Sequence, residues 1–288
     1  MGFSIFTDTM ADLTFQQVEE AAQQRVPVLF PIAVIEEHGP HLPLGTDTYL
    51  AYQVCMGVKR GLERLGQPSL VAPPFYWGIN QATSGFGGSF TVRPQTLIDI
   101  LCDTLVCLKT WGFTHIFLLN FHGDPLHNAT VVAAVKQASE VLGVGVFFHV
   151  PRPWLANLGL TGDEPYLLLE PPYERPSPLP PPPEFLDVHA GGPETSLMLR
   201  YYPDLVDEPV ARSLASSRTP LAMLREWQQG GVAGRTITPL GYLGNPSEIR
   251  PDLADRYHAR VTDRLPQHIM AVLMRENEAS RKSSTEAE

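Results

Sequence analysis

Short apolar runs alternate with longer amphipathic stretches along most of this sequence, and this alternation restricts the fold more than any other feature. Strands that alternate with helices are typical of a mainly parallel β-sheet covered by helices, so the predicted fold class is α/β. The predicted strands cover residues 28–35, 69–72, 115–120 and 144–150. The predicted helices cover residues 15–24, 48–65, 94–111, about 128–142 and 195–201.

The run 28–35 is apolar throughout, as expected of a strand that is buried on both faces. Pro31 within this run lacks a backbone donor, which indicates a sheet edge or a bulge. Thr14 can cap the first helix, and Pro94 can begin another because proline is tolerated at a first helical position.

One segment has a different composition, since residues 171–183 have the sequence PPYERPSPLPPPP. Such a run excludes helix and central strand, and it favours a stiff polyproline-like conformation. It is either a linker or insertion without a role, or a lid or oligomer contact that leads toward His189. We expect one domain over residues 1–275, with 171–186 as the Pro-rich lid or insertion. The polar stretch 276–288 is predicted to be a disordered tail.

The chain has a formal net charge of −10, which excludes the clustered basic surface of a nucleic-acid-binding protein. No apolar run reaches the roughly 18–20 residues that cross a bilayer. Residues 1–11 lack the features of a signal peptide, so a cytoplasmic protein without a membrane partner is expected. Cys55, Cys102 and Cys107 lack zinc-ligand spacing and are predicted to be reduced thiols in the core.

The densest group of chemically active residues follows the strand 28–35. Glu36 and His38 are two positions apart, so an extended segment would project both side chains to the same side. Glycines and prolines then favour turns that can bring Asp47 back to them, and a carboxylate can bridge two cations. Carboxylate and imidazole together suit Zn, Mn or Fe. The alternative is a loop without metal, in which Asp47 only starts the next helix.

Two further groups contain histidine and carboxylate. His122 and Asp124 follow the strand 115–120 with the same two-residue spacing, at the edge where open α/β sheets place ligands. His189 can titrate near neutral pH, and Glu194 lies at the start of a helix, where a structural cap is the alternative role. The remaining residues of these types are expected outside the site: Glu37 and His41 pointing away from it, His127, His258 and His268 on the surface, and His115 and His149 in strand packing.

The strings EEHGPHLPLGTD, NFHGD and HAGGPETS occur in this order, and together they resemble the creatininase (creatinine amidohydrolase) family. Residues 86–94 and 241–246 are similar to two glycine-containing loops of that family. The resemblance extends from about residue 14 to 275. Two segments depart from the family pattern: the loop 86–94 lacks the family's usual proline before its glycine, and the proline run replaces much of the substrate lid at 154–186. These departures argue against creatinine as the substrate.

The resemblance implies a three-layer αβα sandwich with two divalent metal ions. By motif, Glu36 and His122 would hold one ion and His38 the other, with Asp47 as the bridge. Asp124 stands where creatininase has a glutamate ligand of the second ion. The assignments that complete the site are Glu194 as the alternative ligand and a catalytic residue, His189 as the catalytic proton carrier, and Ser84, Gly123 and Trp154 as substrate contacts.

The expected activity is hydrolysis of a C–N bond in a cyclic or small linear amide, with water activated by the metals as the nucleophile. The alternative within the family is removal of a formyl group or cleavage of a peptide. A non-catalytic scaffold is the third possibility, and retention of the whole ligand set argues against it. The resemblance also implies a homo-oligomer, in the form of a hexamer.

Overall fold

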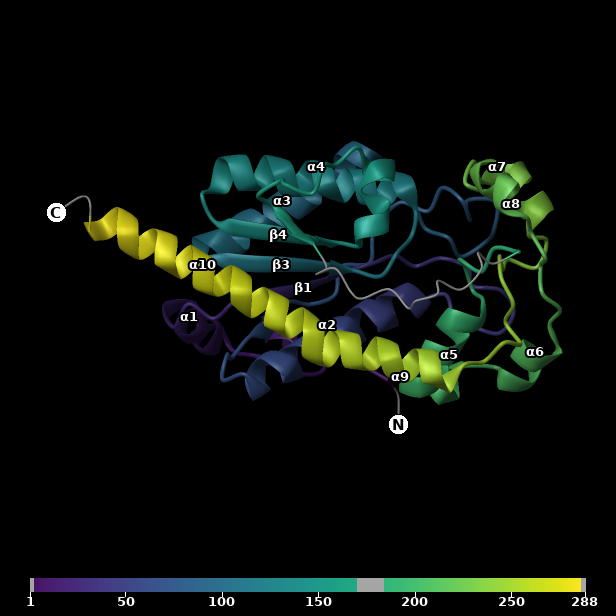
Figure 1. Ribbon diagram of the computed structural model, residues 1–288, viewed down its shortest axis with the longest axis horizontal. Coiled ribbons are helices and arrows are strands. Elements are labelled where there is room, and N and C mark those ends of the chain that lie inside the picture. The colour runs from purple at the N-terminus through teal and green to yellow at the C-terminus, as the bar shows by residue number, and fades with distance from the viewer. Residues whose placement is uncertain (1–2, 170–183, 286–288) are drawn as a thin grey trace, which may run out of the picture.

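The computed structural model describes residues 3–169 and 184–285, with side chains as far as Arg275. Its centre is a five-stranded sheet in the order β2-β1-β3-β4-β5, and each pair of neighbouring strands is parallel (Figure 1). The strands are β1 (Val28–Ile32), β2 (Leu70–Val71), β3 (His115–Asn120), β4 (Gly145–Val150) and β5 (Leu167–Leu169). The prediction of a mainly parallel sheet is confirmed.

Helices cover both faces of the sheet. The helices of the first half are α1 (Phe15–Gln23), α2 (Thr46–Arg64), α3 (Pro94–Thr110) and α4 (Pro125–Leu142). Those of the second half are α5 (Gly192–Tyr201), α6 (Glu208–Ser213), α7 (Leu224–Trp227), α8 (Gly231–Ile237), α9 (Pro251–Ala259) and α10 (Leu265–Thr285). A π-helical turn, Arg260–Arg264, joins α9 to α10.

Alternate residues of the strands pack into two separate cores, because successive strand side chains point to opposite faces. Phe30 and Leu118 belong to the core that α3 and α4 cover, and Leu29 and Phe117 belong to the core that α2 and α10 cover. Figure 1 shows α3 and α4 above the sheet and α2 below it, with α10 crossing obliquely in front. This is the predicted three-layer αβα arrangement.

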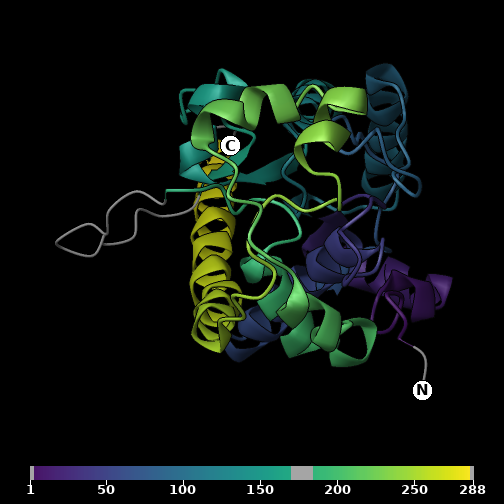
Figure 2. The same ribbon diagram turned by 90° about the vertical axis from the view of Figure 1, so that its right-hand side faces the viewer.

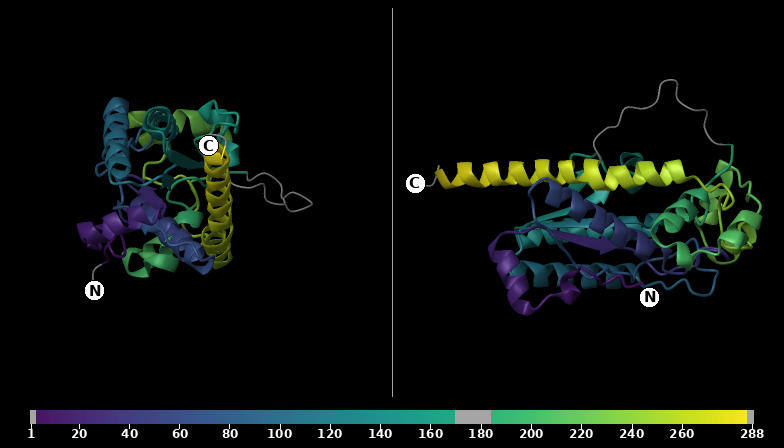
Figure 3. Two further views of the ribbon diagram at one scale, coloured as in Figure 1. Left: turned by 90° about the vertical axis from the view of Figure 1, so that its left-hand side faces the viewer. Right: turned by 90° about the horizontal axis from the view of Figure 1, so that it is seen from below.

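The second half of the chain builds one end of the molecule. Helices α5–α8 gather beyond the carboxyl ends of the strands, and Figure 2 views the molecule from that end. The long helix α10 runs back along the body and extends past it, as the right-hand view of Figure 3 shows. Loops that leave the strands therefore meet the α5–α8 segment at this end.

Several boundaries differ from the predictions. Strand β1 ends at Ile32, and its Pro31 lies in an interior strand rather than at an edge or bulge. The carbonyl of Pro31 accepts a hydrogen bond from the amide of Phe75, on the side where the short β2 has already ended. The missing donor therefore costs the sheet no regular ladder bond.

Two helices are longer than predicted. Helix α4 begins at Pro125, because Asp124 caps it and proline suits its first position. Helix α10 continues to Thr285, so the predicted disorder of residues 276–285 is wrong; helix-forming Glu, Ala, Arg and Lys are frequent there. Residues 286–288 and most of the proline run lie outside the described residues, so its role stays a prediction.

None of the helices within the described part of the chain combines the length and the apolar character that a membrane crossing requires. The three cysteines form no disulfide with one another. Cys55 is buried as predicted, whereas Cys102 is half-buried and Cys107 is exposed in a cavity between α1 and α3. The prediction of a core thiol is therefore wrong for Cys107.

Candidate metal centre

Acidic and imidazole side chains meet at the carboxyl ends of the neighbouring strands β1 and β3, and we call this group the ligand cluster. Glu36 and His38 come from the loop after β1, and Asp47 comes from the first turn of α2. His122 comes from the loop after β3, and His189 and Glu194 lie at the start of α5. All of them are buried except Glu194, which is partly buried. The sequence motifs therefore converge in space.

Asp47 lies between two histidines of the ligand cluster. Its Oδ2 is 2.8 Å from Nδ1 of His122, and its Oδ1 is 3.3 Å from Nε2 of His38. Asp47 also lies in the first turn of α2, where the helix dipole favours a negative charge. The sequence left two roles open for Asp47, as a site residue or as a residue that starts a helix. Its position is compatible with both roles at once.

Glu36 contacts the same side of the ligand cluster as His122. Its Oε1 is 3.1 Å from Nδ1 of His122. Its Oε2 accepts a hydrogen bond of 2.5 Å from the hydroxyl of Thr83, which fixes the orientation of the carboxylate. Nothing in the sequence pointed to Thr83, since it lies 47 residues from Glu36.

Glu194 faces the other histidine. Its Oε2 lies 3.8 Å from Nε2 of His38 and accepts a 2.6 Å hydrogen bond from the amide of Ala190, just before α5. The predicted alternatives, a structural role at the helix start and a role in the site, are therefore both compatible with its position.

The rings of His38 and His122 are held by backbone carbonyls. Nδ1 of His38 is 3.1 Å from the carbonyl oxygen of Glu36, and Nε2 of His122 is 3.0 Å from that of Ile79. In the neutral rings these nitrogens carry the proton, so the other nitrogen of each ring faces the carboxylates with its lone pair. Histidines that bind metals are held in this way. Nε2 of His38 is buried and has no hydrogen bond within residues 3–169 and 184–285.

Three sets of side chains within the ligand cluster have the separations of ligands around one cation. One is Glu36, His38 and His189. The other two share Asp47, and they are Glu36, Asp47 and His122, and His38, Asp47 and Glu194. The N···O distances in these sets are 2.8, 3.1, 3.3 and 3.8 Å. Two neighbouring ligands of a tetrahedral ion with bonds of about 2.1 Å are about 3.4 Å apart. The donors therefore fit divalent cations without a large rearrangement.

Charge pairing dominates the protonation of the ligand cluster. Burial alone would lower the pKa of His38, but the charge of Asp47 outweighs burial and raises that pKa to about 10. Burial would also lower the pKa of His122, but Glu36 and Asp47 outweigh burial and raise that pKa well above its ordinary value. Burial would raise the pKa of Asp47, yet His38 and His122 hold it well below the usual range. Protons thus balance the carboxylates when no cation is bound, and a cation would replace them.

The carboxylate of Asp124 makes backbone contacts on both of its oxygens. One oxygen of its carboxylate accepts hydrogen bonds from the amides of Leu126 and His127, and the other accepts from the amides of Gln81 and Ala82. Asp124 is therefore the cap of α4 and a clamp on the 81–82 loop. It belongs to neither set of side chains around Asp47, so the geometry favours Glu194 over Asp124 as the remaining ligand.

A cavity of about 230 Å³ opens onto the ligand cluster. Gly123 and Trp154, two of the predicted substrate contacts, line it together with Trp227 of α7. A Cβ atom on Gly123 would meet no atom within 4 Å, so the wall is open there. Ser84 does not line this cavity, because its Oγ accepts a 2.9 Å hydrogen bond from the amide of Gly231; its predicted substrate role is therefore not supported.

Other histidines lie partly as predicted. His115 and His149 are buried in strands, as expected. His127 is fully buried rather than on the surface, because its ring packs against that of His122 with the centroids 5.0 Å apart. His258 and His268 are half-buried, so they reach the surface only in part.

Glu37 and His41 were both predicted to point away from the site. His41 is buried outside the ligand cluster, with its Nε2 2.9 Å from the hydroxyl of Thr195. Glu37 also points away from Glu36 and His38, as predicted, but its carboxylate reaches His189. The sequence analysis missed this contact, because 152 residues separate the two positions.

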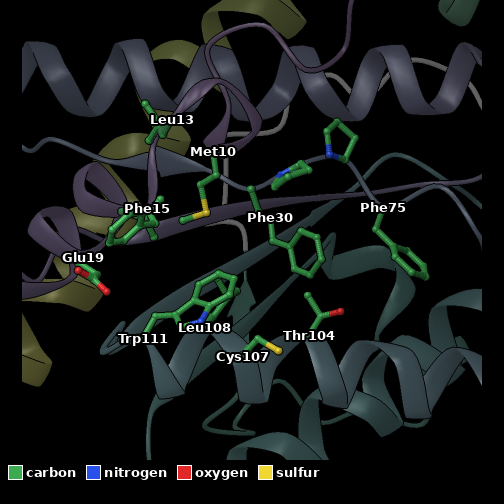
Figure 4. A pocket seen from close by; sticks show the side chains of 14 residues that line it. Met10, Leu13, Phe15, Glu19, Phe30, Phe75, Thr104, Cys107, Leu108 and Trp111 are labelled. Carbon is green, nitrogen blue, oxygen red and sulfur yellow. The ribbon is translucent and has the colours of Figure 1, made fainter.

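A larger cavity lies elsewhere. It has a volume of about 710 Å³ and is lined by side chains of α1, α3 and the segment after β2, among them Phe15, Phe75 and Trp111 (Figure 4). Its lining is mainly apolar, and Glu19 is the charged residue among the described lining side chains. It holds no cluster of metal-ligand types, so the chemistry belongs to the smaller cavity at the ligand cluster.

Comparison with known proteins gives a family match. The sequence model of the creatininase family, described as creatinine amidohydrolase, matches residues 11–269. A mycofactocin precursor peptide peptidase from Mycolicibacterium smegmatis is 28% identical over 243 residues, which cover 82% of this chain and 81% of that protein. A creatinine amidohydrolase from Pseudomonas putida is 29% identical over 216 residues, which cover 72% of this chain and 75% of that protein.

Solved structures show the same fold. The crystal structure of creatinine amidohydrolase (creatininase) aligns with a TM-score of 0.64 at 23% identity, covering 93% of this chain and 97% of that one. The fold expected from the sequence motifs is thus confirmed over nearly the whole chain.

Proposed function

This chain belongs to the creatininase family, and from that premise we propose that it is a metal-dependent amidohydrolase that holds two divalent cations in the ligand cluster. Zn, Mn and Fe are the candidate ions, because the donors are carboxylates and imidazoles. The reaction would be hydrolysis of the C–N bond of an amide.

The observation that carries this proposal is the position of Asp47 in two of the three ligand sets. Its two oxygens face two histidines, so one carboxylate can contact both cations. Glu36 and His122 would complete the first site, and His38 and Glu194 would complete the second. Each histidine turns its other nitrogen toward the carboxylates, because a backbone carbonyl holds the first one, so a cation that displaces the proton there would meet a lone pair.

Two divalent cations, when bound, can polarise a substrate carbonyl and lower the pKa of water toward about 7. The residues of the chain supply the remaining requirements. Trp154 and Trp227 wall the cavity and limit the access of bulk water. His189 lines the same cavity, and its ring can carry a proton between water and the nitrogen that leaves.

The pKa of His189 agrees with this role. Burial would lower it, but Glu36 and Glu37 together outweigh burial and raise it above its ordinary value. A raised pKa makes the neutral ring a stronger base toward water, and the proton that it takes up is then available for the leaving nitrogen. We therefore propose His189 as the catalytic acid, with Glu194 as a metal ligand beside it.

The small cavity supports a cyclic or small linear amide as the substrate. A peptide or N-formyl substrate is the alternative, and one observation favours it. A second cavity of about 230 Å³ shares His122, Gly123 and Trp154 with the first and extends toward Tyr257 and Arg260. A longer substrate could therefore occupy space beyond the scissile bond.

A substrate panel tests the proposal. Purified protein loaded with Zn²⁺, Mn²⁺ or Fe²⁺ would be assayed against lactams, N-formyl amines and short peptides, with release of the amine as the readout. We expect metal-dependent turnover of at least one class, and a large but measurable decrease of kcat in His189→Ala. Protein that binds no metal under any loading condition would exclude the proposal and favour the non-catalytic scaffold.

The homo-oligomer also remains a proposal, carried over from the family resemblance as a hexamer. Sedimentation equilibrium measures it directly. A species at the one-chain mass of 31.8 kDa would exclude it.

A further inference from the structure

His189 is held from one side by both the main chain and the side chain of Glu37. Nε2 of His189 lies 2.9 Å from the carbonyl oxygen of Glu37 and 3.3 Å from Oε1 of its carboxylate. Both of these atoms are acceptors, so Nε2 must carry a hydrogen. The other nitrogen, Nδ1, faces the ligand cluster, at 3.8 Å from Oε1 of Glu36.

The fold fixes Glu37 in this position from several directions. Its second carboxylate oxygen accepts a 3.0 Å hydrogen bond from the amide of Gly39, and its own amide donates to Oγ of Ser89. Gly241 passes so close that a Cβ atom there would lie 1.9 Å from Oε2 of Glu37, and its φ of +77° also suits only glycine well. The segment after Gly241 in turn pairs with His189, since Leu243 and His189 form a β-bridge.

The aromatic neighbours of His189 restrict its ring further. The ring centroid of His189 is 4.6 Å from that of His38 and 5.8 Å from that of Trp227. The ring therefore cannot turn over freely to exchange its two nitrogens. Glu37 and the packing together define one orientation.

We propose that Glu37 is a positioning residue that holds the Nε2–H of His189 and thereby makes Nδ1 the atom that transfers the proton. This inference rests on the proposed amidohydrolase function, and it names a residue that the function itself does not require. Carboxylate–histidine pairs orient catalytic and metal-binding imidazoles in many enzymes.

The proton balance of the step is simple. As water adds to the carbonyl carbon, a C–O bond forms and the water loses a proton, which Nδ1 of His189 accepts. The C–N bond then breaks, its electron pair goes to nitrogen, and Nδ1 returns the proton to that nitrogen. Nε2 keeps its hydrogen bond to Glu37 throughout, so the products are a carboxylic acid and an amine.

The first test reads the tautomer and does not depend on turnover. In ¹⁵N-histidine-labelled, Zn²⁺-loaded protein, the ¹⁵N shifts of His189, assigned by comparison with His189→Gln, report which nitrogen carries the hydrogen in the neutral ring. We expect the hydrogen on Nε2. A hydrogen on Nδ1, or a shift that shows Nδ1 bound to zinc, would overturn the proposal even if the protein hydrolysed no amide.

The second test is a double-mutant cycle of Glu37→Ala and His189→Ala. Its substrate is the amide that the wild type hydrolyses fastest in the substrate panel. Glu37→Ala should lower kcat by about 10–100-fold, the usual effect of losing such an orienting partner, with little change in KM or metal content. In the His189→Ala background the same substitution should have no further effect. A loss of equal size in that background would show that Glu37 does not act through His189.

Glu37→Gln provides the conservative variant. Its amide oxygen can still accept from Nε2, and its shape is nearly that of Glu37, so the protein should fold. We expect it to recover a large part of the activity lost in Glu37→Ala. Activity of Glu37→Gln as low as that of Glu37→Ala, with the ring hydrogen still on Nε2, would contradict a positioning role.

Discussion

Nδ1 of His122 lies 2.8 Å from Oδ2 of Asp47, although 75 residues separate the two positions. His122 follows β3, and Asp47 begins α2 after the loop that leaves β1. Because β1 and β3 are parallel neighbours, their carboxyl ends bring both loops to one edge of the sheet. The contact is therefore a consequence of strand order, and it makes Asp47 the centre of the ligand cluster.

The competition between Glu194 and Asp124 for the last ligand position leads to the first prediction. Glu194→Ala should lower the metal content from about two ions per chain toward one, because it removes a donor from the set around His38. Asp124→Asn should leave the metal content close to that of wild type. Elemental analysis of both variants after gel filtration measures this, and the reverse pattern would restore Asp124 as the ligand.

Asp124 should instead matter for stability. Its carboxylate accepts four backbone hydrogen bonds, so Asp124→Ala should lower the free energy of unfolding by about 1–3 kcal/mol. Urea denaturation of the metal-free protein measures the change without any contribution from bound ions. An unchanged midpoint would show that the cap of α4 contributes little.

Thr83 should tune metal affinity through Glu36. Thr83→Val removes the hydroxyl that donates to Oε2 of Glu36 and keeps the shape of the side chain. We expect the affinity for the first cation to fall by about 10–100-fold, since such orienting contacts have that effect in other metal sites. Competition with a chromophoric chelator measures it. Thr130→Val is the matched control, because Thr130 is buried in α4 and bonds only to the carbonyl of Leu126.

The raised pKa of His38 predicts a pH dependence of the metal-free protein. Its folded-state value of about 10 exceeds the ordinary value of about 6.5, so the protonated ring stabilises the folded state. This stabilisation is fully present below about pH 6.5 and is lost as the pH rises through about 10. Urea midpoints measured from pH 6 to pH 10 on chelator-treated protein should therefore decline.

His38→Gln separates this effect from the other titrating groups. The variant lacks the imidazole, so its urea midpoint should fall less between pH 6 and pH 10 than that of wild type. Parallel curves for the two proteins would show that the pairing of His38 with Asp47 does not set the pH dependence.

The strands could be predicted because continuous apolar runs in the sequence indicate strands that are buried on both faces. His115–Asn120 was predicted with its observed bounds, and the continuous apolar run beginning at Val28 is buried on both faces. Pro31 misled the prediction, since its effect depends on where the neighbouring strand β2 ends. That length is a tertiary property, which local sequence does not encode.

The ligand cluster could be predicted where two-residue spacing meets an extended segment, as at Glu36 and His38. The same spacing failed at Asp124, because helix α4 begins at the next residue and its free amides take the carboxylate. Contacts between residues far apart in the sequence could not be predicted from it. Glu37 and His189, or Thr83 and Glu36, meet only because separate loops converge at one end of the sheet.

If Asp47 joins two cation sites, its loss should empty both, and the number of metal ions bound per chain shows whether it does. Wild type, Asp47→Ala and the control Asp207→Ala, which alters the cap of α6, would be loaded with Zn²⁺, desalted and analysed for metal per chain. We predict close to two ions in wild type and in the control, and loss of both together in Asp47→Ala. One ion in wild type, or one ion retained in Asp47→Ala, would contradict a bridged pair of sites.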